Sequence, residues 1–414
     1  MTKEDESFNV LDVGCGTKPK GDVNIDFFGG DLNPQTGDQV QGEFMSREKI
    51  ENFVIADAAH LPFKDESFNV VFSSHTIEHV QDPLLMLREM YRVAKRKVVV
   101  RFPHRKGSGA IMPYHINYLD ENWFKQASNY IGFKGAHLAA ATYEGLITPK
   151  LKKTCPSTLQ STLPWRALGR FERSRLGQKF KVPFEMEVWL KKRCTLADSS
   201  AKMKFVVVYN IPEIFRSRFS SSPYVSPDTV IAYRNTHKEP LPKFFNKVIQ
   251  KHLQENIWFV FCHQDFILKE DLGRRLRGKN VETIYGPIGT RAGQAKFSGM
   301  IVQTDGTPIG VRLKETALVQ TLDEMCLIAH SEVFRQGLSF DERFRFHFYG
   351  ADLCMQAYTL GFDVMAMQLK CQHKSKTIHG DITSKDYLTA LEVFSEKWKR
   401  FSPIRTTTTR IPDE

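Results

Sequence analysis

Short apolar runs rich in β-branched residues alternate with polar turns over the first hundred residues of the chain. Between the last two of these runs, apolar residues recur with helical spacing from Leu84 to Tyr91, directly after the helix-start signal Asp82-Pro83. Strand–helix alternation predicts an open parallel sheet covered by helices, with ligands at the carboxyl ends of the strands. The predicted strands are Asn9–Val13, Val23–Asp26, Phe53–Ala56, Val70–Ser73 and Lys97–Phe102.

A second series of apolar runs begins after the polar segment Asp198-Ser199-Ser200. It predicts an amphipathic helix over Phe244–Gln254 and a later helix that starts near Asp352 and stops at Gly361. The domains expected from these patterns are residues 1–198 and 202–400, followed by a tail over 401–414. The predicted strands of the second domain are Lys204–Tyr209, Thr229–Tyr233 and Trp258–Cys262.

Composition is that of an ordinary globular protein. The chain has 414 residues, of which 41% are hydrophobic and 25% are charged, which argues against a disordered or fibrous protein. No apolar run reaches the roughly 18 residues of a membrane-spanning helix, and the acidic N-terminus lacks the apolar core of a signal peptide. Seven cysteines without a CxxC pair fit a reducing compartment, so a cytoplasmic protein is expected.

The net charge of +11 is concentrated in one stretch. Twelve Lys or Arg and three Glu lie between Lys150 and Arg193, which contributes 12 − 3 = +9. This basic stretch, an insertion at about 150–183, could be a solvated connector, a phosphate-facing flap or a patch that docks on anionic lipid at the inner face of the membrane. Nucleic acid is the weaker partner, because no RNA-binding signature with stacking aromatic residues accompanies the charge.

Polar residues and glycines follow the predicted strands of the first domain. The G-x-G of Leu11–Gly16 lets the backbone turn sharply and approach a ligand closely. Asp26 ends the second strand, where a carboxylate can accept hydrogen bonds from both ribose hydroxyls. Asp57, beside Ala58, ends the third strand and could bind an adenine amino group. The fourth strand runs into the sequence of Ser73–Val80.

These segments resemble class I S-adenosylmethionine-dependent methyltransferases, in the subgroup whose fourth strand ends in Ser-His-x-x-Glu-His. The resemblance covers residues 8–135, and Phe184–Lys191 could supply the last, antiparallel strand. Only ten positions separate Gly16 from Asp26 and a third glycine is absent, which argues against a nicotinamide dehydrogenase. The resemblance implies S-adenosylmethionine as cofactor, bound by Asp12, Gly14, Gly16, Asp26, Asp57, Ala58 and Ser74.

Methyl transfer is an in-line displacement that needs positioning of the two reactants, and a base if the acceptor is a hydroxyl. The candidate bases are His75, which we take as the catalytic candidate, and His79, His104 and His115. The pattern His75-x-x-Glu78-His79 also matches certain zinc peptidases, but the sequence supplies no obvious third ligand.

In the second domain, His263-Gln264-Asp265 directly follows a buried strand. This is a suitable place for a divalent cation that bridges the two phosphates of a nucleotide sugar. Asp352, in the sequence Tyr349-Gly350-Ala351-Asp352, is predicted at a helix N-terminus, where a carboxylate is favoured by the helix dipole and would face outward.

Together these motifs resemble family-2-like glycosyltransferases of the GT-A fold over residues 204–375. The resemblance implies a nucleotide-sugar donor, inversion at the anomeric carbon and Asp352 as the general base. It also implies Mn²⁺ or Mg²⁺ held by Asp265, His263 and His373. Two departures are His263 in place of the first Asp of Asp-x-Asp, and Ala351 in place of the usual Glu. The candidate substrate-binding residues are Asn210, Asn235, Asn246, Asp323 and Glu324.

The expected architecture is α/β with two domains, a Rossmann-like methyltransferase sheet followed by a GT-A type mixed α/β domain. The expected function is a bifunctional transferase that glycosylates and methylates a glycan, such as a surface polysaccharide on a lipid-linked acceptor. Two alternatives stay open. One is a methyltransferase whose second half only binds carbohydrate, and the other is an RNA methyltransferase that uses the basic stretch.

Overall fold

The computed structural model describes residues 9–27, 50–110, 112, 114–145, 181–194, 196–373 and 382–412. The chain forms two compact units, Met1–Cys194 and Thr195–Glu414. Most of the basic stretch, residues 150–180, lies outside the described residues. No helix in the described ranges is both long enough and apolar enough to cross a membrane.

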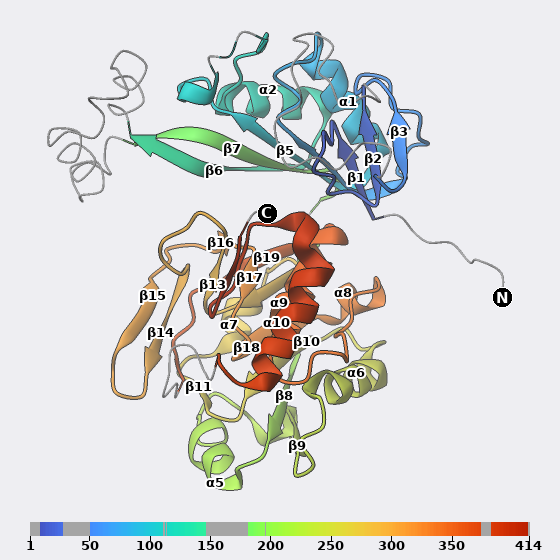
Figure 1. The fold of residues 1–414 in the computed structure, drawn as a ribbon. Helices are drawn as coiled ribbons and strands as arrows, with labels where there is room; N and C mark the ends of the chain where they lie inside the picture. The colour runs from blue at the N-terminus through green and yellow to red at the C-terminus, as the bar shows by residue number, and fades with distance from the viewer. Residues whose placement is uncertain are drawn as a thin grey trace, which may run out of the picture. The chain divides into compact units, whose positions relative to one another are not determined.

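The first unit contains a seven-stranded sheet in the order β3-β2-β1-β4-β5-β7-β6 (Figure 1). Strands β1 to β5 are parallel, whereas β7 is antiparallel to both β5 and β6. The elements are β1 Val10–Val13, β2 Val23–Asp26, β3 Phe53–Ile55, β4 Phe68–Ser74, α1 Pro83–Val93, β5 Ala94–Pro103, the 3₁₀ turn Ser108–Ala110, α2 Glu121–Ile131, β6 Gly135–Gly145 and β7 Lys181–Lys191.

The five strands predicted before residue 103 are confirmed, with the largest shift at β5, which begins at Ala94 rather than Lys97. The antiparallel last strand is confirmed as β7. Helix α1 forms for the predicted reason, since the Asp82 carboxylate accepts a hydrogen bond from the amide of Leu85 (2.8 Å) and Pro83 takes the first helical position. The sheet order reverses between β2-β1 and β4, which creates a switch point above the end of β1.

The second unit has a mixed seven-stranded sheet in the order β16-β19-β12-β18-β10-β8-β9, in which β18 is antiparallel to both neighbours. A smaller sheet has the order β11-β20-β14-β15. The strands are β8 Met203–Tyr209, β9 Val230–Arg234, β10 Trp258–His263, β11 Phe266–Leu268, β12 Thr283–Gly286, β13 Gly289–Thr290, β14 Gly299–Gln303, β15 Pro308–Val311, β16 Ala317–Leu318, β17 Thr321–Leu322, β18 Cys326–His330, β19 Asp363–Ala366, β20 Cys371–His373, β21 Ile404–Arg405 and β22 Arg410–Ile411. The helices are α5 Pro212–Ile214, the π-helical turn Phe215–Phe219, the 3₁₀ turn Pro227–Thr229, α6 Leu241–His252, α7 Leu272–Leu276, α8 Ser331–Arg335, α9 Tyr349–Thr359, α10 Lys385–Trp398 and the 3₁₀ turn Lys399–Phe401.

The strands predicted in the second half are confirmed as β8, β9 and β10, and the amphipathic helix is confirmed as α6, beginning three residues earlier at Leu241. The segment predicted as a tail packs on this unit. The Thr321 hydroxyl donates to the carbonyl of Arg405 (2.6 Å), and the Thr407 hydroxyl donates to the Asp323 carboxylate (2.7 Å).

Candidate functional site

The turn after β1 is built around two glycines with positive φ, Gly14 at 75° and Gly16 at 57°. A Cβ on Gly14 would lie 2.1 Å from the Thr76 hydroxyl oxygen, so only glycine fits against the end of β4. Apart from its chain neighbours, no residue that the structure describes lies within 4 Å of a Cβ placed on Gly16. The turn is held by hydrogen bonds from the amides of Gly14 and Cys15 to the carbonyl of Ile25 (2.9 and 3.0 Å). A backbone shaped this way leaves room for a ligand beside Gly16.

Two carboxylates flank this turn. The amide of Gly16 donates to Asp26 at the end of β2 (2.9 Å), which fixes the Asp26 side chain at the mouth of the turn. Asp12 is almost fully buried and accepts a hydrogen bond from the amide of Lys20 (2.8 Å). Burial raises the pKa of Asp12 to about 7. Next to Asp26, the Phe27 side chain is 59% exposed and offers an apolar surface to a ligand.

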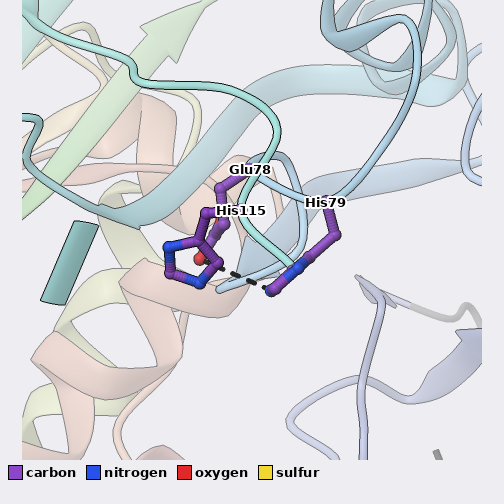
Figure 2. A group of neighbouring side chains, drawn as sticks. All are labelled: Glu78, His79 and His115. Atoms are coloured by element: carbon purple, nitrogen blue, oxygen red, sulfur yellow. Dashed lines mark ion pairs between the residues drawn. The ribbon is translucent and has the colours of Figure 1, made fainter. Parts of the chain in front are cut away.

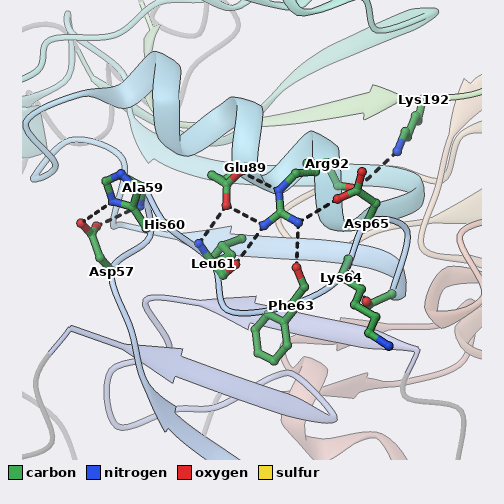
Figure 3. A network of polar contacts seen from close by, with 11 residues as sticks. Asp57, Ala59, His60, Leu61, Phe63, Lys64, Asp65, Glu89, Arg92 and Lys192 are labelled. Atoms are coloured by element: carbon green, nitrogen blue, oxygen red, sulfur yellow. Dashed lines mark hydrogen bonds and ion pairs between the residues drawn. The ribbon is translucent and has the colours of Figure 1, made fainter.

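The loop that carries Asp57 is anchored by helix α1 (Figure 3). Arg92 donates to the carbonyls of Leu61 (2.9 Å) and Phe63 (2.7 Å) and pairs with Glu89 (2.7 Å). Asp57 itself accepts from the amide of Ala59 (2.9 Å) and lies 3.1 Å from a ring nitrogen of His60. Ala58 packs against the hydrophobic core, and Ser74 is the last residue of β4.

His75 is held between two carboxylates. Its Nε2 lies 2.9 Å from Glu185 Oε1, and its Nδ1 lies 3.4 Å from Glu78 Oε1. Burial alone would lower the pKa of His75, but the neighbouring Glu185 and Glu78 outweigh it and raise the pKa to about 9. An imidazolium does not accept a proton at neutral pH, so the structure does not favour His75 as the base. The zinc-peptidase pattern is wrong for this segment, because Ile77–His79 form a turn after β4 rather than a helix.

In the second unit, the three predicted metal ligands lie together. Single ligand atoms of His263, Asp265 and His373 are all within 4.8 Å of one another, because β11 begins directly after Asp265 and its first residue, Phe266, pairs with His373 of β20. His373 Nε2 lies 3.2 Å from Asp265 Oδ1. Burial disfavours the charged forms of both His373 and Asp265. Their contact with each other outweighs it, so the pKa of His373 is raised and that of Asp265 is lowered. Burial and the nearby charge of His373 lower the pKa of His263.

The predicted substrate residues have different surroundings. The backbone amide of Asn210 donates to Gln264 Oε1 (3.1 Å), and Gln264 Nε2 donates to the side-chain oxygen of Asn210 (2.8 Å). The Asn235 side chain is buried and fully engaged with the backbone of Glu239, and that of Asn246 bonds to the backbone of Phe340. These last two amides hold loops in place.

Asp323 and Glu324 lie beside the start of α9. The Asp323 carboxylate accepts from the amide of Met325 (3.0 Å) and from the Thr407 hydroxyl. Glu324 accepts from the amide of Gly350 (2.9 Å), and burial raises its pKa to about 8. Tyr349, which the sequence patterns did not single out, links this pair to the metal-ligand group, because its hydroxyl lies 3.2 Å from His263 Nε2 and donates to the carbonyl of Glu324.

The expectation that Asp352 faces outward is wrong. It is placed in the first turn of α9 as predicted, but its side chain is fully buried. Its carboxylate accepts from Lys397 Nζ (2.7 Å), Trp398 Nε1 (2.8 Å) and Gln356 Nε2 (2.6 Å). Burial raises the pKa of Asp352, although Lys397 opposes this. Lys397 and Trp398 come from the end of α10, far along the chain, so no local pattern near residue 352 could have revealed them.

Comparison with known proteins gives matches to methyltransferases. Residues 11–102 match a family model described as a methyltransferase domain. Norajmaline N-methyltransferase from Rauvolfia serpentina is 35% identical over 107 residues, which cover 23% of this chain and 37% of that protein. Tocopherol O-methyltransferase, chloroplastic, from Arabidopsis thaliana is 26% identical over 189 residues, which cover 40% of this chain and 53% of that protein. The chain therefore spans about a third to a half of the length of these relatives.

Among solved structures, a SAM-dependent methyltransferase from Archaeoglobus fulgidus is 19% identical. The match covers 45% of this chain and 87% of that one, with a TM-score of 0.29. The methyltransferase domain in the N-terminal region is therefore identified from the sequence match over residues 11–102.

Proposed function

We propose that the protein is a methyltransferase. The N-terminal region of the chain carries a class I S-adenosylmethionine-dependent methyltransferase domain, which supports this proposal. The observation that carries the proposal is the turn at the switch point. There Gly14 is pressed against Thr76, and the amide of Gly16 holds the Asp26 carboxylate. Known relatives named for N- and O-methylation agree with the class of reaction but leave the acceptor open.

The residues of this turn fit the cofactor. Asp26 would accept hydrogen bonds from the ribose hydroxyls, Phe27 would cover one face of the adenine, and Asp57 would accept from its amino group. The open side of Gly16 would admit the methionine portion. When bound, the cofactor supplies a sulfonium methyl group that a nucleophile can displace. The chain's own contribution is positioning, because His75 is held as an imidazolium by Glu185 and Glu78.

The test is S-adenosylmethionine binding to the full chain, measured by calorimetry. Asp26→Asn should weaken binding at least tenfold, because an amide would replace the carboxylate that holds the Gly16 amide and would accept from the ribose hydroxyls. The control is Asp305→Asn, a fully exposed position in the other unit, which should bind as the wild type does. Unchanged binding in Asp26→Asn, or none in the wild type, would remove the proposal.

We further propose that the second unit transfers a sugar from a nucleotide-sugar donor to a glycan acceptor. The favouring observation is the convergence of His263, Asp265 and His373, two imidazoles and a carboxylate that suit a divalent cation beside a diphosphate. A role for Asp352 as base requires release of its carboxylate from Lys397. A unit that only binds carbohydrate would leave that contact intact.

Titration of the full chain with UDP-, GDP- and dTDP-sugars, with and without Mn²⁺, tests this second proposal. Mn²⁺-dependent binding that is lost in His373→Gln, together with sugar transfer, supports it. Binding without transfer would instead favour the carbohydrate-binding alternative. No binding of any donor would contradict both, and salt-sensitive RNA binding in its place would favour an RNA methyltransferase.

A further inference from the structure

Three ligand-type side chains meet just beyond β4, in the first unit. Figure 2 shows Glu78, His79 and His115 turned toward one another, and one ligand atom from each lies within 4.8 Å of the others. Glu78 and His79 come from the turn after β4, whereas His115 comes from a separate segment. His75, the first residue of the zinc-peptidase pattern, is not part of this group.

The backbone brings the two segments together. The amides of Ile116 and Asn117 both donate to the carbonyl of Glu78 (3.0 and 3.1 Å). The Asn117 side-chain amide donates to the carbonyls of Ile77 (3.1 Å) and Val80 (2.7 Å). These bonds span both sides of Glu78, so the position of His115 beside it is fixed by the backbone and by the Asn117 side chain and does not depend on the side chains of the cluster.

Both imidazoles are oriented to present a lone pair. His79 Nδ1 lies 3.2 Å from the carbonyl of Tyr114, and His115 Nδ1 lies 3.1 Å from the carbonyl of Ala110. A carbonyl can only accept, so each Nδ1 carries the proton and each Nε2 of the neutral ring is an acceptor. Backbone carbonyls orient metal-binding histidines in the same way.

Glu78 is a buried carboxylate that has His75 as an ion-pair neighbour but accepts no hydrogen bond from the described residues. The side chain is 1% exposed, and neither oxygen has a hydrogen-bond partner among the residues that the structure describes. His75 Nδ1 and His79 Nε2 approach Oε1 only to 3.4 and 4.0 Å, without hydrogen-bond geometry. A buried carboxylate without hydrogen bonds is costly, and a bound cation would remove that cost.

We propose that Glu78, His79 and His115 form a binding site for a divalent transition-metal ion such as Zn²⁺. Two imidazoles and one carboxylate are a donor set that such ions accept. Bonds of about 2.1 Å in a tetrahedral site place ligand atoms about 3.4 Å apart, so the three groups would close by about 1 Å or slightly more. The His79 side chain is 31% exposed, which leaves the site open to a further ligand from solvent.

The site goes beyond methyl transfer and does not depend on it. It is distinct from the His263, Asp265 and His373 group of the second unit, so the experiment must separate the two. We would use the full chain with His263→Gln and His373→Gln, titrate it with Co²⁺, and follow both the visible d–d absorption and the bound metal per chain.

The expected result is one equivalent of Co²⁺ in this background. His115→Gln and Glu78→Gln should each weaken binding at least tenfold and abolish the absorption. The matched control is His137→Gln, an exposed histidine of the same unit on β6, which should leave binding unchanged. Circular dichroism checks folding, and His115 is only partly buried, so its variant remains informative if Glu78→Gln is unstable. Absence of Co²⁺ and Zn²⁺ binding in the background, or equal binding in His115→Gln, would overturn the proposal.

Discussion

Gly14 is the residue on which the strand-end turn most depends. Gly14→Ala would put a Cβ 2.1 Å from the Thr76 hydroxyl oxygen and would strain a φ of 75°. Gly16→Ala would meet only the backbone strain, about 1 to 2 kcal/mol, because no atom of the described residues beyond its chain neighbours lies within 4 Å of the added Cβ. We therefore expect Gly14→Ala to lose more unfolding free energy and more S-adenosylmethionine affinity than Gly16→Ala. Urea unfolding and calorimetry compare the two, and equal losses would contradict this account.

The buried carboxyl of Asp12 makes stability depend on pH. Its pKa is about 7 in the folded chain against 3.8 when unfolded, so between these values the folded state keeps a proton that the unfolded state has lost. The contribution of Asp12 to stability is therefore full below about pH 4 and declines as the pH rises toward 7, by at most about 4 kcal/mol.

Asp12→Asn removes this titration. The difference in unfolding free energy between wild type and Asp12→Asn should fall as the pH is raised from 5 to 8, as measured by urea unfolding. Asp305→Asn is the control, since the Asp305 side chain is fully exposed and its pKa lies below the usual value. A wild-type to Asp12→Asn difference that stays constant with pH would show that Asp12 ionises normally in the folded chain.

Among secondary-structure elements, α10 has a specific role in covering α9. Lys397 Nζ bonds to Asp352 of α9 (2.7 Å) and to Asp341 (2.8 Å). Lys397→Met would leave a buried carboxylate without its cation, which costs about 3 kcal/mol or more, and the loss should shrink as the pH falls because burial raises the pKa of Asp352. Lys399→Met, which breaks a surface pair with Glu396, should cost under about 1 kcal/mol.

A double-mutant cycle separates this contact from general damage to the helix. Asp352→Asn combined with Lys397→Met should recover part of the loss seen in Lys397→Met alone, because no buried charge remains. Equilibrium unfolding of the four chains gives the coupling energy. Additive losses would mean that α10 stabilises α9 without this ion pair.

The helices and strands of the two units show what local sequence patterns can predict. Apolar spacing and start signals predicted β1 to β5, α1 and α6, and three strands of the second unit, β8, β9 and β10, because these features depend on neighbours in the sequence. The strands from β11 to β20 and the long strand β6, with its alanine-rich sequence, were not predicted. Most of them are short, and many pair with partners far along the chain, as β11 does with β20 and β12 with β19. For the same reason Asp352 was wrongly expected to face outward and His115 was not placed beside Glu78.

For the chain as a whole, the two units should unfold separately. Each has its own buried core, centred on residues such as Leu11 and Val98 in the first and Phe205 and Ile328 in the second. A ligand stabilises only the unit whose folded state binds it, by about 2.7 kcal/mol at a concentration of 100 times its Kd. Calorimetry should therefore show two transitions, of which S-adenosylmethionine raises one, and Asp26→Asn should remove that shift. A single transition that moves as a whole with the cofactor would show that the units unfold as one cooperative body.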